Sequence, residues 1–263
     1  MEKLLETERN EFLIACLRTV SAWLNVQVYA TSEMGIAIES TVLKTIKKCL
    51  KTNADDVLKT SAPAILNYAE IMPCRSVIME SGIIQCLGEI LVTPDGKISE
   101  EALCLVTQCL MVLCLESPDK GPFTMMLQSL MQLFISLPKS TSLPFYIAAL
   151  ALMIWNLEGA KNYVEQERFF KTLVAFLHNI HKVGETGIQI TESYREIWPS
   201  VEQLWPIIVK ELIRSANNEP WVKEVLLESG IKRKIQNLTS QDSEEPESDL
   251  HSGYGLLLTL FED

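Results

Sequence analysis

A ladder of similar five-residue segments constrains the fold of this chain more than any other feature. Three segments carry an asparagine at their fourth position: Ala22-Trp23-Leu24-Asn25-Val26, Ala64-Ile65-Leu66-Asn67-Tyr68 and Met153-Ile154-Trp155-Asn156-Leu157. Val112 completes the ladder, and the four positions are separated by 42, 45 and 44 residues. A period of about 40–47 residues is typical of stacked helical repeats. The ladder therefore predicts an elongated array whose units pack on their neighbours and together present a surface.

A second motif supports the same repeat. Glu80-Ser81-Gly82-Ile83 returns as Glu228-Ser229-Gly230-Ile231, and each glycine lies fifteen residues after a ladder position, Asn67 or Ser215. A glycine that ends a short helix can adopt the left-handed conformation and turn the chain sharply. The pattern after Gly82 predicts a helix with one apolar face and then a long helix over about 99–115. The residues of that apolar face are Ile83, Leu87, Ile90 and Leu91.

Together these motifs resemble the armadillo family, whose repeats follow N-R-x-x-I-x-x-x-G-x-I-x-x-L-x-x-L-L in the first two helices and A-L-x-N-L in the third. The resemblance covers residues 22–238. It implies an all-α fold, a right-handed α-solenoid of about four to five three-helix repeats. HEAT repeats have a similar period, and an irregular all-helical domain is the remaining alternative.

The late part of the chain departs from the pattern. Asn156 and Ser215 are 59 residues apart, and we expect the surplus in a loop over 181–188. Arg168 stands where the glycine of that repeat belongs. The apolar run Leu143–Leu157 is too short to span a membrane and predicts a helix buried on several sides.

Helical periodicity also places the early elements. It predicts helices over residues 2–28 and 39–51, separated by a polar break at 31–35. Asn53 or Asp55 is expected to cap the next helix, which reaches about Ile71.

The predicted domain organisation is a helical repeat domain over residues 1–239, an acidic linker over 240–253 and an apolar segment over 254–263. The linker is polar and acidic enough to remain disordered. The apolar segment is expected to dock on the repeat domain, either as a cap on the last repeat or in the binding groove.

Composition limits which partners and which compartment are expected for the chain. The chain carries 34 acidic and 23 basic residues, a net charge of −11, which disfavours direct binding to nucleic acid. Apolar or basic protein segments, as a peptide or a helix, are the expected partners. Seven cysteines without a C-x-x-C motif indicate buried thiols in a reducing compartment. With no signal peptide and no membrane span, we expect an intracellular protein, cytoplasmic or nuclear.

No pattern in the sequence indicates catalysis. Nucleotide-binding, nucleophile-elbow and zinc-protease motifs do not occur. His178 and His181 are three residues apart at a helix end, and Cys104, Cys109 and Cys114 are five apart, but neither set is completed by further ligands. We therefore expect no enzymatic activity, no metal and no cofactor, and a small-molecule ligand is not indicated.

The resemblance implies a role for the ladder positions. In armadillo repeats the third-helix asparagine lines a concave groove and binds the backbone of a peptide, which implies this role for Asn25, Asn67 and Asn156. An equally weighted interpretation is that each amide ties a neighbouring repeat in place. The family's tryptophan, four residues before the asparagine, is Ser21, Pro63 or Leu152 here, so binding of nuclear localisation signals is doubtful. The predicted binding residues are Asn25, Asn67, Gln108, Val112, Leu152, Asn156 and Ser215.

The predicted function is a protein-binding scaffold that uses this groove, and exposed groove asparagines are expected to tolerate alanine without loss of stability. Two alternatives are a regulator or exchange factor acting on an enzyme such as a small GTPase, and an armadillo-type scaffold in a nuclear or meiotic complex. Trp198, Trp205 and Trp221 are interpreted as core side chains near the end of the array rather than interface anchors.

Overall fold

The fold consists almost entirely of helices. The computed structural model describes residues 9–19, 33–70, 78–92, 97–116, 121–157, 166–184, 187–233 and 257. The chain divides into two compact units, Met1–Met126 and Leu127–Asp263. Helical structure dominates both units, as the sequence predicted.

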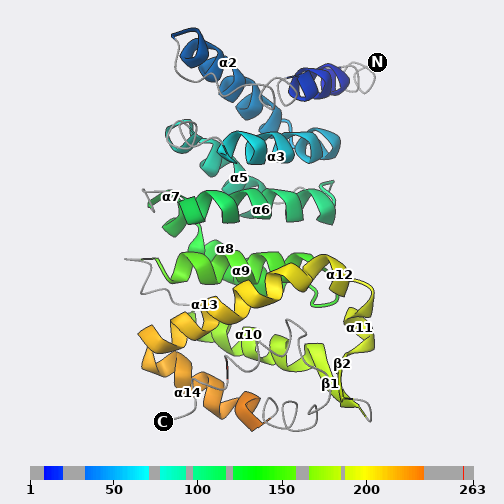
Figure 1. The fold of residues 1–263 in the computed structure, drawn as a ribbon, viewed down its shortest axis with the longest axis vertical. Helices are drawn as coiled ribbons and strands as arrows, with labels where there is room; N and C mark the ends of the chain where they lie inside the picture. Colours follow the sequence, from blue (N-terminus) through cyan, green and yellow to red (C-terminus); the bar gives the residue numbers. More distant parts are fainter. Residues whose placement is uncertain are drawn as a thin grey trace. The chain divides into compact units, whose positions relative to one another are not determined.

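Helices packed in layers form the first unit (Figure 1). After a helical segment over 9–19, its elements are α2 (Glu33–Leu50), α3 (Asp55–Glu70), α5 (Ile83–Val92), α6 (Glu100–Glu116) and α7 (Gly121–Thr124). Both α3 and α5 pack against α2 and α6. The apolar face predicted for α5 is confirmed, because Ile83, Leu87, Ile90 and Leu91 are all buried.

α3 and α6 run parallel, in the register that the sequence period predicts. At their amino-terminal ends, the backbone N–H of Ser99 donates to Asp55 Oδ1 at 2.7 Å, and Lys59 Nζ lies 2.6 Å from Glu101 Oε2. Further along, Cys109 Sγ donates to the carbonyl oxygen of Ala62 at 3.2 Å. The contacting residues are 42 to 47 positions apart in sequence, which brackets the spacing of 45 between Asn67 and Val112.

The two Glu-Ser-Gly-Ile motifs form the same turn. Gly82 has φ +76° and Gly230 has φ +72°, so both adopt the predicted left-handed conformation. In the first turn, Ser81 Oγ donates to the carbonyl of Ile78 at 2.6 Å and accepts from the N–H of Ile83 at 3.2 Å. Ser229 makes the equivalent bonds at 2.7 and 3.3 Å. The sequence repeat is therefore a repeat of local structure.

Helix bounds early in the chain differ from prediction. α2 begins at Glu33, so Gly35 lies within a helix instead of a polar break. Gly35 is the third residue of α2, and a glycine costs at most about 1 kcal/mol relative to alanine in a helix, which the rest of an 18-residue helix can offset. Asp55 does begin α3, but its carboxylate binds the start of α6 and does not cap its own helix.

In its described residues, the second unit has helices and one small sheet. Its elements are α8 (Leu127–Ser136), α9 (Leu143–Trp155), α10 (Gln166–Ile180), β1 (His181–Gly184), β2 (Gly187–Ile190), α11 (Glu192–Arg195), α12 (Trp198–Val201), the 3-10 helix η1 (Glu202–Leu204), α13 (Trp205–Asn218) and α14 (Pro220–Glu228). α9 packs between α8 and α13, and twelve of its thirteen residues are buried, which confirms the predicted buried helix.

Edge-to-face aromatic contacts join the helices of the second unit. Phe170 of α10 lies 5.4 Å from Trp155 of α9 and 5.3 Å from Trp221 of α14, measured between ring centroids. Trp205 is 1% exposed. The core interpretation of Trp205 and Trp221 agrees with these positions, whereas the side chain of Trp198 lies outside the described residues.

The predicted loop over 181–188 is wrong. β1 and β2 pair antiparallel, with His181 opposite Ile190 and Gly184 opposite Gly187. The short strand pattern is carried by Val183, Ile188 and Ile190, and the strong helical signal of the preceding residues obscured it. Arg168 is likewise not at a turn, since it lies within α10. The residues between α10 and α13 therefore form a hairpin and the short helices that follow it.

After residue 233, the only residue that the structure describes is Leu257, which has no exposed surface. The predicted boundaries at 240 and 253 lie outside the described residues. We expect removal of all residues after Ser240 to lower the melting temperature, because burying one leucine contributes about 1.5–3 kcal/mol. Thermal unfolding followed by circular dichroism tests this. An unchanged melting temperature together with tighter partner binding would instead identify the segment as a competitor for the groove.

Candidate protein-binding surfaces

The predicted binding residues fall into different environments. Gln108 is exposed and Val112 is partly exposed, both on α6. Leu152 and Ser215 have no exposed surface. Asn67 lies in α3, although its side chain is outside the described residues, as is the whole of Asn25.

Asn156 and Ser215 meet in a polar network between α9 and α13. Asn156 Nδ2 donates to the Glu211 carbonyl at 2.8 Å and to Glu211 Oε2 at 2.9 Å. The Ser215 hydroxyl lies 3.1 Å from Asn156 Oδ1 and 2.9 Å from the Glu211 carbonyl. Glu211 is only 8% exposed, and Arg214 Nη1 lies 3.8 Å from its carboxylate. The ladder positions 156 and 215 therefore contact each other directly.

Three of the predicted binding residues make contacts inside the second unit. The Asn156 amide donates to the neighbouring helix α13, where the buried carboxylate of Glu211 needs a hydrogen-bond donor. Ser215 belongs to the same network, and Leu152 packs in the core of α9. Of the two interpretations of the asparagines, the one in which the amide ties neighbouring helices describes Asn156.

The exposed face of α6 forms a narrow surface of its own. One line of accessible residues follows the helical period, with steps of four or three: Glu101, Leu105, Gln108, Val112 and Leu115. Leu115 is 68% exposed, an unusual exposure for a leucine in a packed helix. Between Glu101 and Glu116, α6 contains no charged residue. We call Leu105, Gln108, Val112 and Leu115 the α6 strip.

The neighbouring helix α3 extends the α6 strip. Pro63 of α3 is exposed and Leu66 is partly exposed. The ion pair between Lys59 and Glu101 places the accessible faces of α3 and α6 side by side at their amino-terminal ends. The two helices thus present an uncharged face that is bounded at one end by charges.

Those boundary charges are held in place. Burial would raise the pKa of Asp55, but hydrogen bonds from Ser99 and Lys59 outweigh it and hold the pKa of the carboxyl below its usual value. Lys59 Nζ lies 3.1 Å from Asp55 and bridges to Glu101. The result is a link between α3 and the start of α6 at one end of the face.

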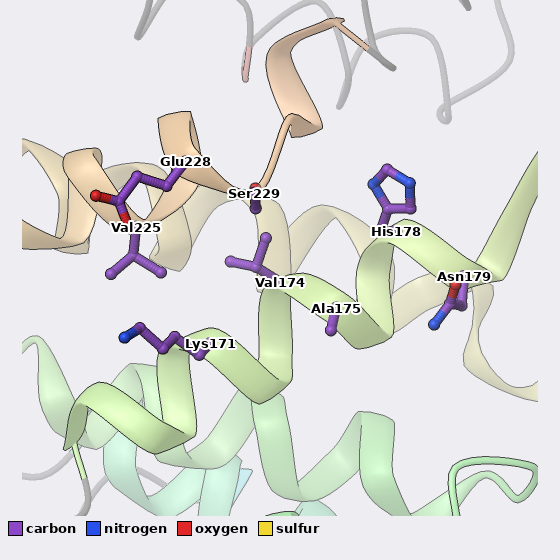
Figure 2. Close-up of a pocket in the computed structure, with 8 residues that line it drawn as sticks. All are labelled: Lys171, Val174, Ala175, His178, Asn179, Val225, Glu228 and Ser229. Carbon is purple, nitrogen blue, oxygen red and sulfur yellow. The ribbon is translucent and has the colours of Figure 1, made fainter.

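A second surface, which sequence reasoning missed, lies between α10 and α14. Figure 2 shows Val174 of α10 and Val225 of α14 between the two helices. They line a recess of about 380 Å³ together with Lys171, Ala175, His178, Asn179, Glu228 and Ser229. An adjoining recess of about 330 Å³ shares Lys171, Val225 and Glu228, and adds Gln166, Glu167, Trp221 and Glu224. We call the two recesses the α10–α14 cleft.

Candidate metal and nucleophile residues do not assemble into a site in the described part of the chain. No group of three or more His, Cys, Asp or Glu side chains placed to hold a metal ion occurs there. His178 lies in the last turn of α10, but His181 begins β1 and is not on the helix. Burial raises the pKa of the Cys49 thiol to about 11 and that of Cys104 to about 12, as expected for packing residues.

Across the helices that the structure describes, none is both long and apolar enough to cross a membrane. No family model matches the chain. The chain is similar to neurochondrin of Xenopus laevis, with 24% identity over 280 residues. This similarity covers 85% of the chain, which spans only 38% of the length of that protein.

Proposed function

We propose that this chain is a non-enzymatic protein-binding scaffold built from armadillo-like three-helix repeats in a right-handed α-solenoid. The α3–α6 face, centred on the α6 strip, binds an apolar peptide or an amphipathic helix of a partner. The observation that carries the proposal is an uncharged strip with a highly exposed leucine, beside a second helix of equivalent register.

The repeated architecture supports the proposal. α3 and α6 are parallel neighbours, as are α9 and α13. Ser142, just before α9, contacts Ser200 of α12, which precedes α13, and the ends of α9 and α13 meet through Asn156 and Ser215. The contacting residues are 44 positions apart in the first pair and 58 to 59 in the second, whose longer separation includes the hairpin and the short helices after it. Parallel equivalent helices placed side by side form the extended surfaces on which repeat proteins bind partners.

The dimensions and chemistry of the α6 strip favour a protein ligand. Its uncharged length, residues 102–115, corresponds to about 20 Å at a rise of about 1.5 Å per residue. Leu105, Val112 and Leu115 supply apolar contacts, as in grooves that receive an amphipathic helix. The amide of Gln108 offers a donor and an acceptor to the backbone of an extended segment.

A single substitution tests this proposal. Leu115→Asp places a charge on the strip without disturbing the core, since the side chain is mostly exposed. We expect partners recovered from cell extract, measured by quantitative mass spectrometry, to fall by roughly tenfold, as for loss of an interface hot spot. The matched control is Leu227→Asp on α14, an exposed leucine of the second unit. Equal recovery with both variants would contradict the assignment of the α6 strip.

A further inference from the structure

The α10–α14 cleft combines an apolar floor with an acidic wall. Val174 is 1% exposed and Val225 is 8% exposed, so the floor is fixed by packing. From α14, the recesses are also lined by Glu224 and Glu228, which are both exposed and one helical turn apart. The cleft therefore suits a ligand with an apolar group and a positively charged group next to each other.

The charges that line the cleft do not balance. Three carboxylates, Glu167, Glu224 and Glu228, face one ammonium group, Lys171, which leaves a net charge of −2. Lys171 is already paired, because its Nζ lies 2.6 Å from Glu167 Oε1. This hydrogen bond raises the pKa of Lys171, and the charge of Glu228 adds to the effect. Within the part of the chain that the structure describes, Glu224 and Glu228 form no ion pair.

The position of Glu228 increases the demand for a cation. It is the last residue of α14, and the last turn of this helix has no basic residue. The carboxyl end of a helix carries partial negative charge and is stabilised by a nearby cation. Like charges four residues apart on a helix also repel each other. A basic side chain between Glu224 and Glu228 would relieve both effects.

A buried acceptor at the other end of the cleft also lacks a donor. Gln166 Oε1 is inaccessible to solvent and has no hydrogen-bond partner. Gln166 lines the recess that contains Trp221 and Glu224. A buried polar atom without a hydrogen bond destabilises the fold. If the Gln166 amide rotates, a donor group of a ligand in the recess can bind its oxygen and remove this free-energy cost.

We propose that the α10–α14 cleft binds a segment of another protein in which a lysine or arginine stands beside a large apolar side chain. The apolar side chain packs on Val174 and Val225, and the cation lies between Glu224 and Glu228. This site is distinct from the α6 strip, which is uncharged and belongs to the first unit. The chain's own segment Tyr254–Asp263 is a poorer occupant, because its only charged side chains are Glu262 and Asp263.

A peptide selection on the full chain tests the proposal. Random 12-residue peptides displayed on phage are selected on the wild-type chain and counter-selected on Ala175→Arg, which fills the cleft from an exposed position. We expect the remaining peptides to be enriched in Lys or Arg next to Leu, Ile or Phe. Binding of a representative peptide, measured by fluorescence anisotropy, should weaken roughly tenfold with Glu224→Gln/Glu228→Gln.

Controls make the outcome decisive. Glu202→Gln removes an exposed carboxylate outside the cleft and should leave peptide binding unchanged. Circular dichroism of each variant shows whether the fold is retained. The proposal would be overturned if every selected peptide also bound Ala175→Arg. It would equally be overturned if the peptides that bind only the wild-type chain were not enriched in Lys or Arg. Deletion of residues 254–263 that strengthens binding tenfold would also overturn it, by identifying the chain's own end as the occupant.

Discussion

Replacing Asn156 with alanine is expected to lower the free energy of unfolding by about 2–4 kcal/mol, because a nearly buried carboxylate loses its amide donor. The amide donates to both the carbonyl and the carboxylate of Glu211, and the Arg214 guanidinium, at 3.8 Å, is too distant to replace it. This result reverses the expectation, from the resemblance to armadillo repeats, that Asn156 can be replaced without loss of stability. Urea denaturation followed by circular dichroism measures the difference.

Gln108→Ala is the matched control for this substitution. It removes an exposed amide from α6, and we expect a change of less than about 0.5 kcal/mol. A second variant, Glu211→Gln, tests whether the charge of Glu211 causes the loss of stability in Asn156→Ala. If the buried charge is responsible, Asn156→Ala costs less in the Glu211→Gln background than in the wild type. Equal urea midpoints for wild type and Asn156→Ala would show that the network contributes nothing to stability.

Replacing Phe170 with alanine should destabilise the second unit by about 3–5 kcal/mol, the usual cost of removing a buried phenylalanine side chain. Phe170 has no exposed surface and lies at the junction of three helices, α9, α10 and α14. Its loss leaves a cavity bordered by Trp155 and Trp221, which cannot close without moving both indoles. Tryptophan fluorescence during urea unfolding reports on this region directly.

Phe12→Ala provides the same chemical change in a different environment. Phe12 is 69% exposed, so its truncation should change the free energy of unfolding by less than about 0.5 kcal/mol. Because the chain has two compact units, its unfolding need not follow a single transition. The fluorescence transition should shift with Phe170→Ala but not with Phe12→Ala. Equal shifts would contradict the packing described for the second unit.

Local backbone features were the most predictable part of the fold. Gly82 and Gly230 could be assigned to left-handed turns because each ends a short helical segment, and few residues other than glycine adopt positive φ at low cost. The buried helix α9 was predictable for a similar reason. Its run of apolar residues leaves no polar face for solvent, and only burial on several sides accommodates it.

Features that depend on contacts between distant residues were not predictable. The role of Asn156 depends on a glutamate 55 residues later, and the amide alone fits a ligand or a helix equally well. The α10–α14 cleft depends on how two helices approach each other, which neither helix encodes separately. The hairpin was missed because four residues of alternating pattern carry little signal beside a 15-residue helix.

Pro63 has a mechanical consequence for α3. Because proline has no backbone N–H, the carbonyl of Lys59 receives no helical hydrogen bond, and α3 is divided into two segments that bend most easily at this point. The adjacent residue, Ala62, is held by the Cys109 thiol of α6. The thiol therefore restrains α3 beside Pro63, where the helix bends most easily. The stiffness of the α3–α6 face thus depends on α6 as well as on α3 itself.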